Sequence, residues 1–172
     1  MIVFYFQRGI PSILLGLFLC LLIPITGCGG GGGISSPGSG QPVQTVLRLG
    51  VSGQLPAGST AISGAEIVLT LPKGVTIQGA PADAVAASGQ AVGKLKPAFI
   101  DYTPPTTTSV ARLSFLMSRV EPVSTLTGGE IATVLFTVAT GALFRPSDVV
   151  VSGRVANQLN SEIPGVGISI LP

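Results

Sequence analysis

The chain has 172 residues and a formal net charge of +2, and 24 of its residues are glycine and 14 are proline. Only 9% of the residues are charged, well below the usual share of about 25%. The sequence contains no histidine and no tryptophan, and both cysteines lie within the first 28 positions. These counts exclude histidine-based catalytic triads, histidine metal sites and a disulfide framework in the rest of the chain.

The first 27 residues have the composition of a secretory signal peptide. Arg8 is the one charged residue in this segment, and a dense apolar run occupies residues 13–23. The run is slightly shorter than the roughly 20 residues of a membrane-spanning helix. We therefore expect an apolar signal-peptide helix over residues 1–27, and a retained membrane anchor is the alternative.

The end of this segment resembles the lipobox of bacterial lipoproteins. Ile25, Thr26 and Gly27 precede Cys28, and Ile25 replaces the more usual leucine. The resemblance implies that a dedicated peptidase recognises these three residues and cuts before Cys28, whose thiol receives a diacylglycerol. Acylation would remove an otherwise unpaired thiol, and several acyl chains anchor a protein stably. The alternative is a plain signal peptide that ends in cysteine.

The same resemblance bears on location. In lipoproteins of well-studied Gram-negative bacteria an aspartate after the cysteine favours the inner membrane, and Gly29 stands there. We therefore expect a lipoprotein of the bacterial cell envelope, with the outer membrane slightly favoured. Residues 28–42 form the lipidated cysteine and a flexible linker rich in Gly, Ser and Pro. The domain that follows, residues 43–172, would then lie in the periplasm or at the cell surface.

Residues 43–172 are long enough for one domain, and their pattern is that of strands and turns. Apolar residues alternate with other residues in short runs bounded by Gly, Pro, Ser and Asn, which is the strand signature. We expect strands at residues 43–51, 66–71, 75–77, 110–117, 130–139, 148–155 and 167–171. Residues 80–91, with many alanines, are expected to be a loop with one turn at most. These features predict an all-β fold, an antiparallel sandwich of two sheets.

The domain has few aromatic residues, and we expect most of them in the core. They are Phe99, Tyr102, Phe115, Phe136 and Phe144. Tyr102 precedes a proline-rich loop and is the best candidate for contact with a ligand; the alternative is an amphipathic residue at the rim of the core.

Three segments resemble the cohesin-type β-sandwich, a relative of bacterial carbohydrate-binding modules. They are residues 62–75, which run into a Pro-containing turn, the apolar strand at 111–118, and the alternating segment at 129–138. The resemblance implies a nine-stranded, jelly-roll-like sandwich with a binding or scaffolding role, since cohesins bind dockerin modules and related modules bind polysaccharide. No binding residue carries over from the family to this sequence.

The remaining residues offer little catalytic chemistry. The seven acidic residues do not form a Ca²⁺ loop, and a glycosidase pair such as Asp101 and Glu130 has no more support than any pair of acids on a sandwich. No Ser-x-x-Lys motif and no phosphate loop is present. Lys94 and Lys96 are the one close basic pair, which is too little for nucleic acid. Cross-strand ion pairs with Glu66 or Glu130 are expected from one or two of Arg112, Arg119, Arg145 and Arg154.

The sequence thus predicts a protein without catalytic activity and without a cofactor or metal. Its expected partners are the membrane, through the acyl groups on Cys28, and an unknown envelope protein. A carbohydrate-binding module, with a polysaccharide as the ligand, is the alternative, and a hydrolase ranks last. An interaction module should present an exposed apolar patch or an unpaired edge strand.

Overall fold

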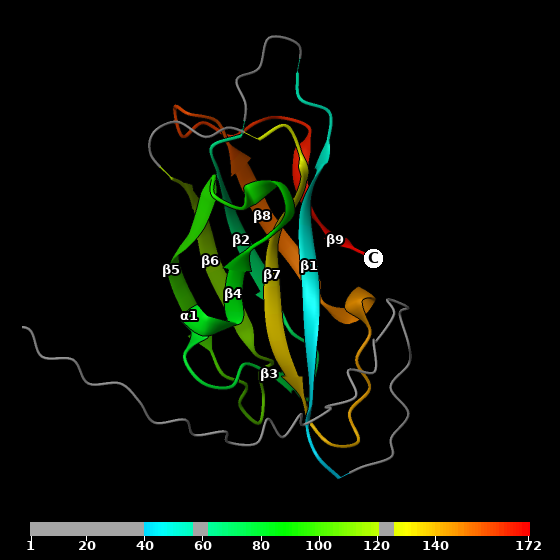
Figure 1. Ribbon diagram of the computed structural model, residues 1–172. Helices are drawn as coiled ribbons and strands as arrows, with labels where there is room; N and C mark the ends of the chain where they lie inside the picture. The colour runs from blue at the N-terminus through cyan, green and yellow to red at the C-terminus, as the bar shows by residue number, and fades with distance from the viewer. Residues whose placement is uncertain (1–39, 57–61, 121–125) are drawn as a thin grey trace, which may run out of the picture. The chain divides into compact units, whose positions relative to one another are not determined.

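The structure of the chain is a computed structural model, which describes residues 40–56, 62–120 and 126–172 (Figure 1). The expected signal-peptide helix, the lipobox from Ile25 to Cys28 and most of the expected linker lie outside these residues. The described linker residues 40–42 are exposed and precede the first strand directly.

The described residues form nine strands in two antiparallel sheets. Sheet I has the order β3-β7-β1-β9, and β4 also pairs with β7. Its strands are β1 (Val43–Gly53), β3 (Val75–Thr76), β4 (Val85–Ala87), β7 (Gly129–Val138) and β9 (Val166–Leu171). Sheet II has the order β5-β6-β2-β8. Its strands are β2 (Gly64–Thr70), β5 (Leu95–Thr103), β6 (Arg112–Arg119) and β8 (Val150–Ala156).

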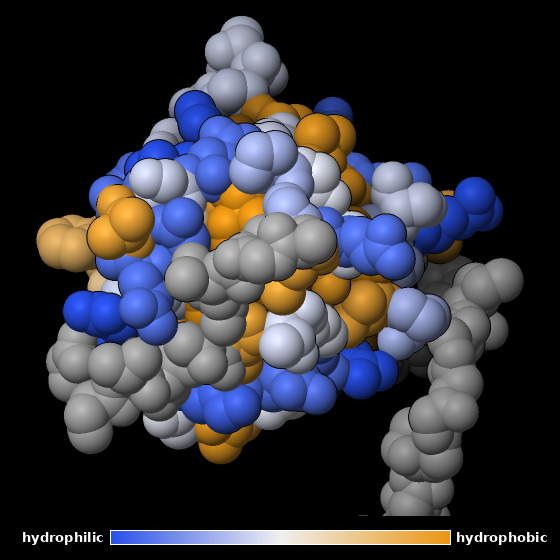
Figure 2. All heavy atoms as spheres, turned by 90° about the horizontal axis from the view of Figure 1, so that it is seen from above, coloured by the Kyte–Doolittle hydropathy of each residue, from blue (hydrophilic) through white to orange (hydrophobic). Residues whose placement is uncertain are grey.

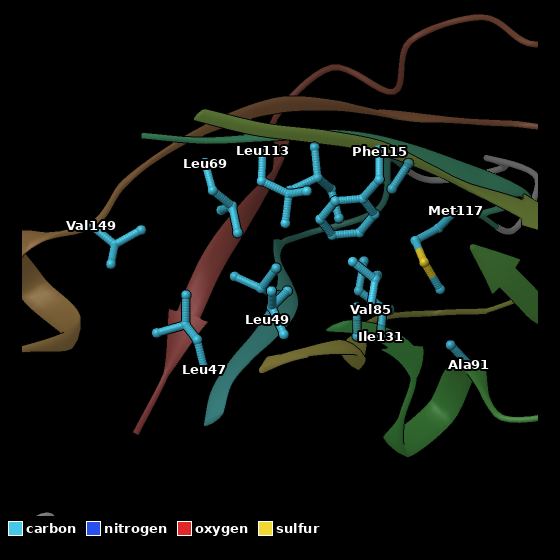
Figure 3. Close-up of a cluster of buried hydrophobic side chains, with 14 of the residues drawn as sticks. Leu47, Leu49, Leu69, Val85, Ala91, Leu113, Phe115, Met117, Ile131 and Val149 are labelled. Atoms are coloured by element: carbon cyan, nitrogen blue, oxygen red, sulfur yellow. The ribbon is translucent and has the colours of Figure 1, made fainter. Parts of the chain in front are cut away.

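The two sheets pack face to face because each strand alternates between buried and outward-facing residues. In β1, Leu47 and Leu49 are buried while Val46 and Arg48 are exposed. Side chains from both sheets point toward one another in the space between them (Figure 3). The largest side chains less than 2% exposed include those of Phe136, Leu47 and Leu49 from sheet I and Ile67, Leu69 and Leu113 from sheet II. Burying such side chains contributes about 1.5–3 kcal/mol each relative to leaving them exposed.

The end of the sandwich shows the same separation of apolar and polar residues. Seen from above, hydrophobic residues gather in the middle of this end and hydrophilic residues surround them (Figure 2). None of the helices in the described part of the chain has the length and apolar character needed to cross a bilayer.

The expectation of an all-β, antiparallel two-sheet sandwich is confirmed. Each of the seven expected strands matches one observed strand to within a few residues. Two further strands, β4 and β5, had no counterpart in the sequence pattern. Residues 80–91 contain the short helix α1 (Pro81–Ala84), then β4, then the 3-10 turn η1 (Gly89–Ala91), and a second 3-10 turn, η2 (Pro146–Asp148), precedes β8.

Two β-bulges interrupt the regular pairing. In sheet I, Leu49 pairs with Ala132 and Gly50 with Glu130, so Ile131 is the extra residue in β7 and both Ile131 and Ala132 are buried. In sheet II, β5 shifts register against β6 between Ala98 and Asp101. A bulge re-aims the side chains of its strand, and the second bulge determines where Phe99 lies.

Candidate functional site

Of the five candidate site residues, Ile25, Thr26, Gly27, Cys28 and Tyr102, only Tyr102 lies in the part of the chain that the structure describes. Its ring is half-buried and packs against the core, and its hydroxyl oxygen accepts a hydrogen bond from the Ile77 backbone N–H at 3.1 Å. The bond ties β5 to the segment after β3, because Tyr102 and Ile77 belong to these two elements. A ligand contact at Tyr102 stays a prediction, as do the roles of Ile25, Thr26, Gly27 and Cys28.

The expectation that most of the aromatic residues lie in the core is confirmed, and Phe99 is the exception. Phe115 and Phe136 are buried, and Phe144 packs against Phe136 in a tilted arrangement, with ring centroids 6.4 Å apart and an interplanar angle of 56°. Phe99, however, is 85% exposed. The reason is the bulge in β5: Ala98 pairs with Leu116 and Asp101 with Ser114, so Phe99 and Ile100 share one position opposite β6.

Phe99 also adopts a backbone conformation that phenylalanine rarely takes. Its φ is +48°, in the left-handed region. Asn160 is the other described non-glycine residue with a positive φ, and asparagine tolerates this region well. Phenylalanine does not, and a strained residue of this kind costs on the order of 1–3 kcal/mol. Phe99 therefore combines a strained backbone conformation with an apolar ring that is largely exposed to solvent.

The surface around Phe99 is mixed in character. Lys96 and Asp101, on the same strand, are exposed, and Ala98 and Leu116 form a half-buried apolar pair beside the bulge. We call Phe99, Lys96, Ala98 and Asp101 the β5 surface. Aromatic side chains are enriched in the cores of protein–protein interfaces, and the rims around those cores are polar.

Among the described residues, Arg154 with Glu66 and Arg48 with Glu130 form ion pairs on the outer faces of the sheets. Arg154 donates from Nε to Glu66 Oε2 at 2.8 Å, and the two residues lie directly opposite each other on β8 and β2. This pair was among those expected from the sequence. Because both side chains are about half exposed, it contributes no more than about 1 kcal/mol.

The second pair joins Glu130 to Arg48, which was not among the arginines expected to pair. Arg48 Nε donates to Glu130 Oε2 at 2.9 Å, and Arg48 Nη1 donates to the Pro172 carbonyl at 3.0 Å. The hydrogen bond from Arg48 holds the pKa of the Glu130 carboxyl below its ordinary value. Arg48 thereby connects β1 to β7 and to the residue that follows β9, across three neighbouring strands of sheet I.

The acidic residues do not converge. Asp101 lies on sheet II, whereas Glu130 lies on sheet I in its pair with Arg48. Among the described residues, no three of His, Cys, Asp and Glu lie close enough together to hold a metal ion.

The burial pattern of β5, which the sequence does not show, explains the exposed phenylalanine. Leu95 is an inward residue at an odd position, and Ile100 and Tyr102 pack against the core from even positions. An extra residue must therefore lie between them, because inward residues of one unbroken strand share the same parity. This shift in parity indicates a bulge in the segment that contains Phe99.

No protein-family model, no curated protein and no solved structure matches this chain.

Proposed function

We propose that this protein is a non-catalytic lipoprotein of the bacterial envelope whose β-sandwich binds another protein. It is anchored through acyl groups on Cys28, and Gly29 favours the outer membrane. The observation that carries the binding role is Phe99, which is 85% exposed at a positive φ on an edge strand of sheet II. Strain of this kind persists where function requires it. A partner that covered the ring would gain apolar burial that the fold itself does not use.

The distribution of aromatic rings favours a protein partner over a polysaccharide. Polysaccharide-binding platforms usually display several exposed rings. Of the five aromatic residues in the described part of the chain, Phe99 alone is exposed, and Tyr102 uses its hydroxyl within the domain. A carbohydrate-binding module is the second candidate, and its support is the position of Tyr102 on the same strand as Phe99.

The nine described strands and their division between two antiparallel sheets support the further proposal of a cohesin-like, jelly-roll sandwich. That proposal agrees with a scaffolding role. The role itself depends on the β5 surface, because one fold serves many functions.

The first test concerns the anchor. In Cys28→Ala the thiol that would carry the lipid is absent, so we expect the protein to leave the membrane fraction or to keep its signal segment uncleaved. Cell fractionation and the mass of the product measure both results. Cys20→Ala is the matched control, because Cys20 lies inside the apolar run and should not matter. A Cys28→Ala protein that fractionates and migrates like the parent would refute the lipoprotein assignment.

The second test concerns the partner. We expect the photo-reactive residue p-benzoylphenylalanine in place of Phe99 to give a discrete cross-linked product in cells of the source organism. Leu159 is the matched control position, because it is 84% exposed and lies in the loop that follows β8. Gel electrophoresis before and after protease or glycosidase treatment identifies the attached molecule.

A protease-sensitive product at position 99 and not at position 159 supports the protein-binding role. A product sensitive to glycosidase alone supports the carbohydrate alternative. Equal labelling at both positions, or none at position 99, contradicts a binding role for the β5 surface.

A further inference from the structure

The four edges of the two sheets are protected to different degrees. Unpaired edge strands attract other strands, and proteins guard them with prolines, charges, bulges or short length. β5 contains Lys96, Pro97 and its bulge, and β8 contains Arg154. On the remaining edge of sheet I, β3 and β4 are two and three residues long. The fourth edge, β9, has none of these guards.

β9 is six residues long, Val-Gly-Ile-Ser-Ile-Leu, and contains no charge and no proline. Within the described residues it pairs only with β1, and it lies at the margin of sheet I beside β8, with which it forms no ladder (Figure 1). Ile168 and Ile170 face inward and are only half-buried. An uncharged strand of this length with partly exposed apolar residues favours strand addition.

The outward face of β9 has a matching alternation of large and small side chains. Leu171 pairs with Arg48 of β1, and its side chain lies over the diagonal neighbour Gly50, where a Cβ would come within 2.8 Å of Leu171 Cδ1. Ser169 pairs with Gly50 and also faces outward. Gly167 faces outward too, and a Cβ built there meets nothing within 4 Å. The outward face of β9 thus has the large side chain of Leu171 at one end, open space at Gly167 at the other end, and Ser169 between them.

We infer that β9 is a self-association edge, which pairs antiparallel with β9 of a second copy about a two-fold axis at Ser169. In this register Ser169 lies opposite its own counterpart. Ile168 lies opposite Ile170, so the half-buried inward residues cover each other. Leu171 lies opposite Gly167, where the open space receives it, much as Gly50 receives Leu171 within the chain.

Two properties of the β9 sequence favour β9 of a second copy of this chain over an unrelated strand as the partner of this edge. First, each copy would place its large Leu171 opposite the open space at Gly167 of the other copy, so both ends of the strand pair are filled in the same way. Second, a pair of identical strands brings like charges close together wherever a strand is charged, and β9 carries no charge that could repel its copy. The inference concerns a different strand from the β5 surface and does not depend on the proposed function.

The test is disulfide trapping in the full chain. We expect Ser169→Cys to convert most of the membrane-extracted protein to a disulfide-linked dimer under a mild oxidant, seen on a non-reducing gel. Cβ atoms of facing residues in an antiparallel pair are about 4.5–5.5 Å apart, close to disulfide geometry. The parent, which contains Cys20 and Cys28, sets the background.

Two controls make the result specific to this register. Gly167→Cys places the thiol on the same face of the same strand, but its counterpart is four residues away, about 13 Å at a rise of about 3.3 Å per residue. It should therefore stay at the parent background, as should Ser152→Cys on β8, which is exposed. Dimer yields from Ser169→Cys that do not exceed those of both controls overturn the inference.

A second variant covers the case in which the cysteine perturbs the strand. Ser169→Lys places two ammonium groups opposite each other at the axis and should leave the full chain monomeric in sedimentation experiments in detergent. Ser52→Lys, on the exposed outer face of β1, should leave the dimer intact. A parent that is monomeric at every concentration, or a Ser169→Lys protein that remains dimeric, also overturns the inference.

Discussion

Phe136→Ala is expected to lower the free energy of unfolding by about 3–5 kcal/mol, a large share of the 5–15 kcal/mol typical of a whole domain. Phe136 is 0% exposed, lies in β7 opposite Thr45 of β1, and packs against Phe144. Its loss removes apolar burial and leaves a cavity, because neighbouring strands of two sheets cannot collapse freely into the space. Urea denaturation followed by far-UV circular dichroism measures the change.

Phe99→Ala is the matched control for this substitution. It removes the same atoms from a side chain that is 85% exposed, so we expect a change within about 0.5 kcal/mol. If the two alanine variants lost similar stability, the assignment of one ring to the core and of the other to the surface would be wrong.

Gly153→Ala is expected to destabilise the domain by about 3 kcal/mol or more, at or above the upper end of ordinary point substitutions. Gly153 lies in β8 opposite Ile67, and a Cβ there would come within 2.1 Å of the Glu66 carbonyl oxygen. The clash is with the backbone of β2, so no side-chain rotation relieves it. β8 would have to move away from β2 and lose part of its ladder. Thermal unfolding followed by circular dichroism shows the result as a lower midpoint.

Gly167→Ala tests whether the effect comes from the clash. The same added methyl group meets nothing within 4 Å there. Alanine restricts the unfolded chain, so we expect unchanged or slightly higher stability, by about 0.4–1 kcal/mol. A Gly153→Ala protein as stable as Gly167→Ala would show that β8 does not pack on β2 as described.

The sequence predicts the fold class well because period-two alternation persists in most strands. In β6 and β7 the inward residues, such as Leu113, Phe115, Val134 and Phe136, are the ones that the alternation singles out, and all four are buried. In β5 the alternation fails, since Lys96 and Pro97 are poor strand residues and the bulge changes the parity after Ala98. β4 is too short, at three residues, to show any period.

The candidate site is harder to predict for the same reason. Local patterns show which residues of a strand share a face, but exposure at Phe99 results from one extra residue and an unfavourable φ, which depend on the pairing with β6. The pairing of Glu130 with Arg48 likewise depends on which strands become neighbours. The proposed lipobox from Ile25 to Cys28 is the opposite case, because a peptidase would recognise it as a linear segment and the prediction therefore needs the sequence alone.

The position of β1 has a mechanical consequence. β1 begins directly after the segment that precedes the domain, and it lies inside sheet I between β7 and β9. A load on that segment enters at Val43 and runs along the strand. β1 can then leave only by sliding against both neighbours at once, since its ladder to β7 extends from Val43 to Val51 and its ladder to β9 from Arg48 to Gly53. Pulling therefore shears many hydrogen bonds in parallel, whereas the same load on an edge strand pulled sideways would open them one at a time.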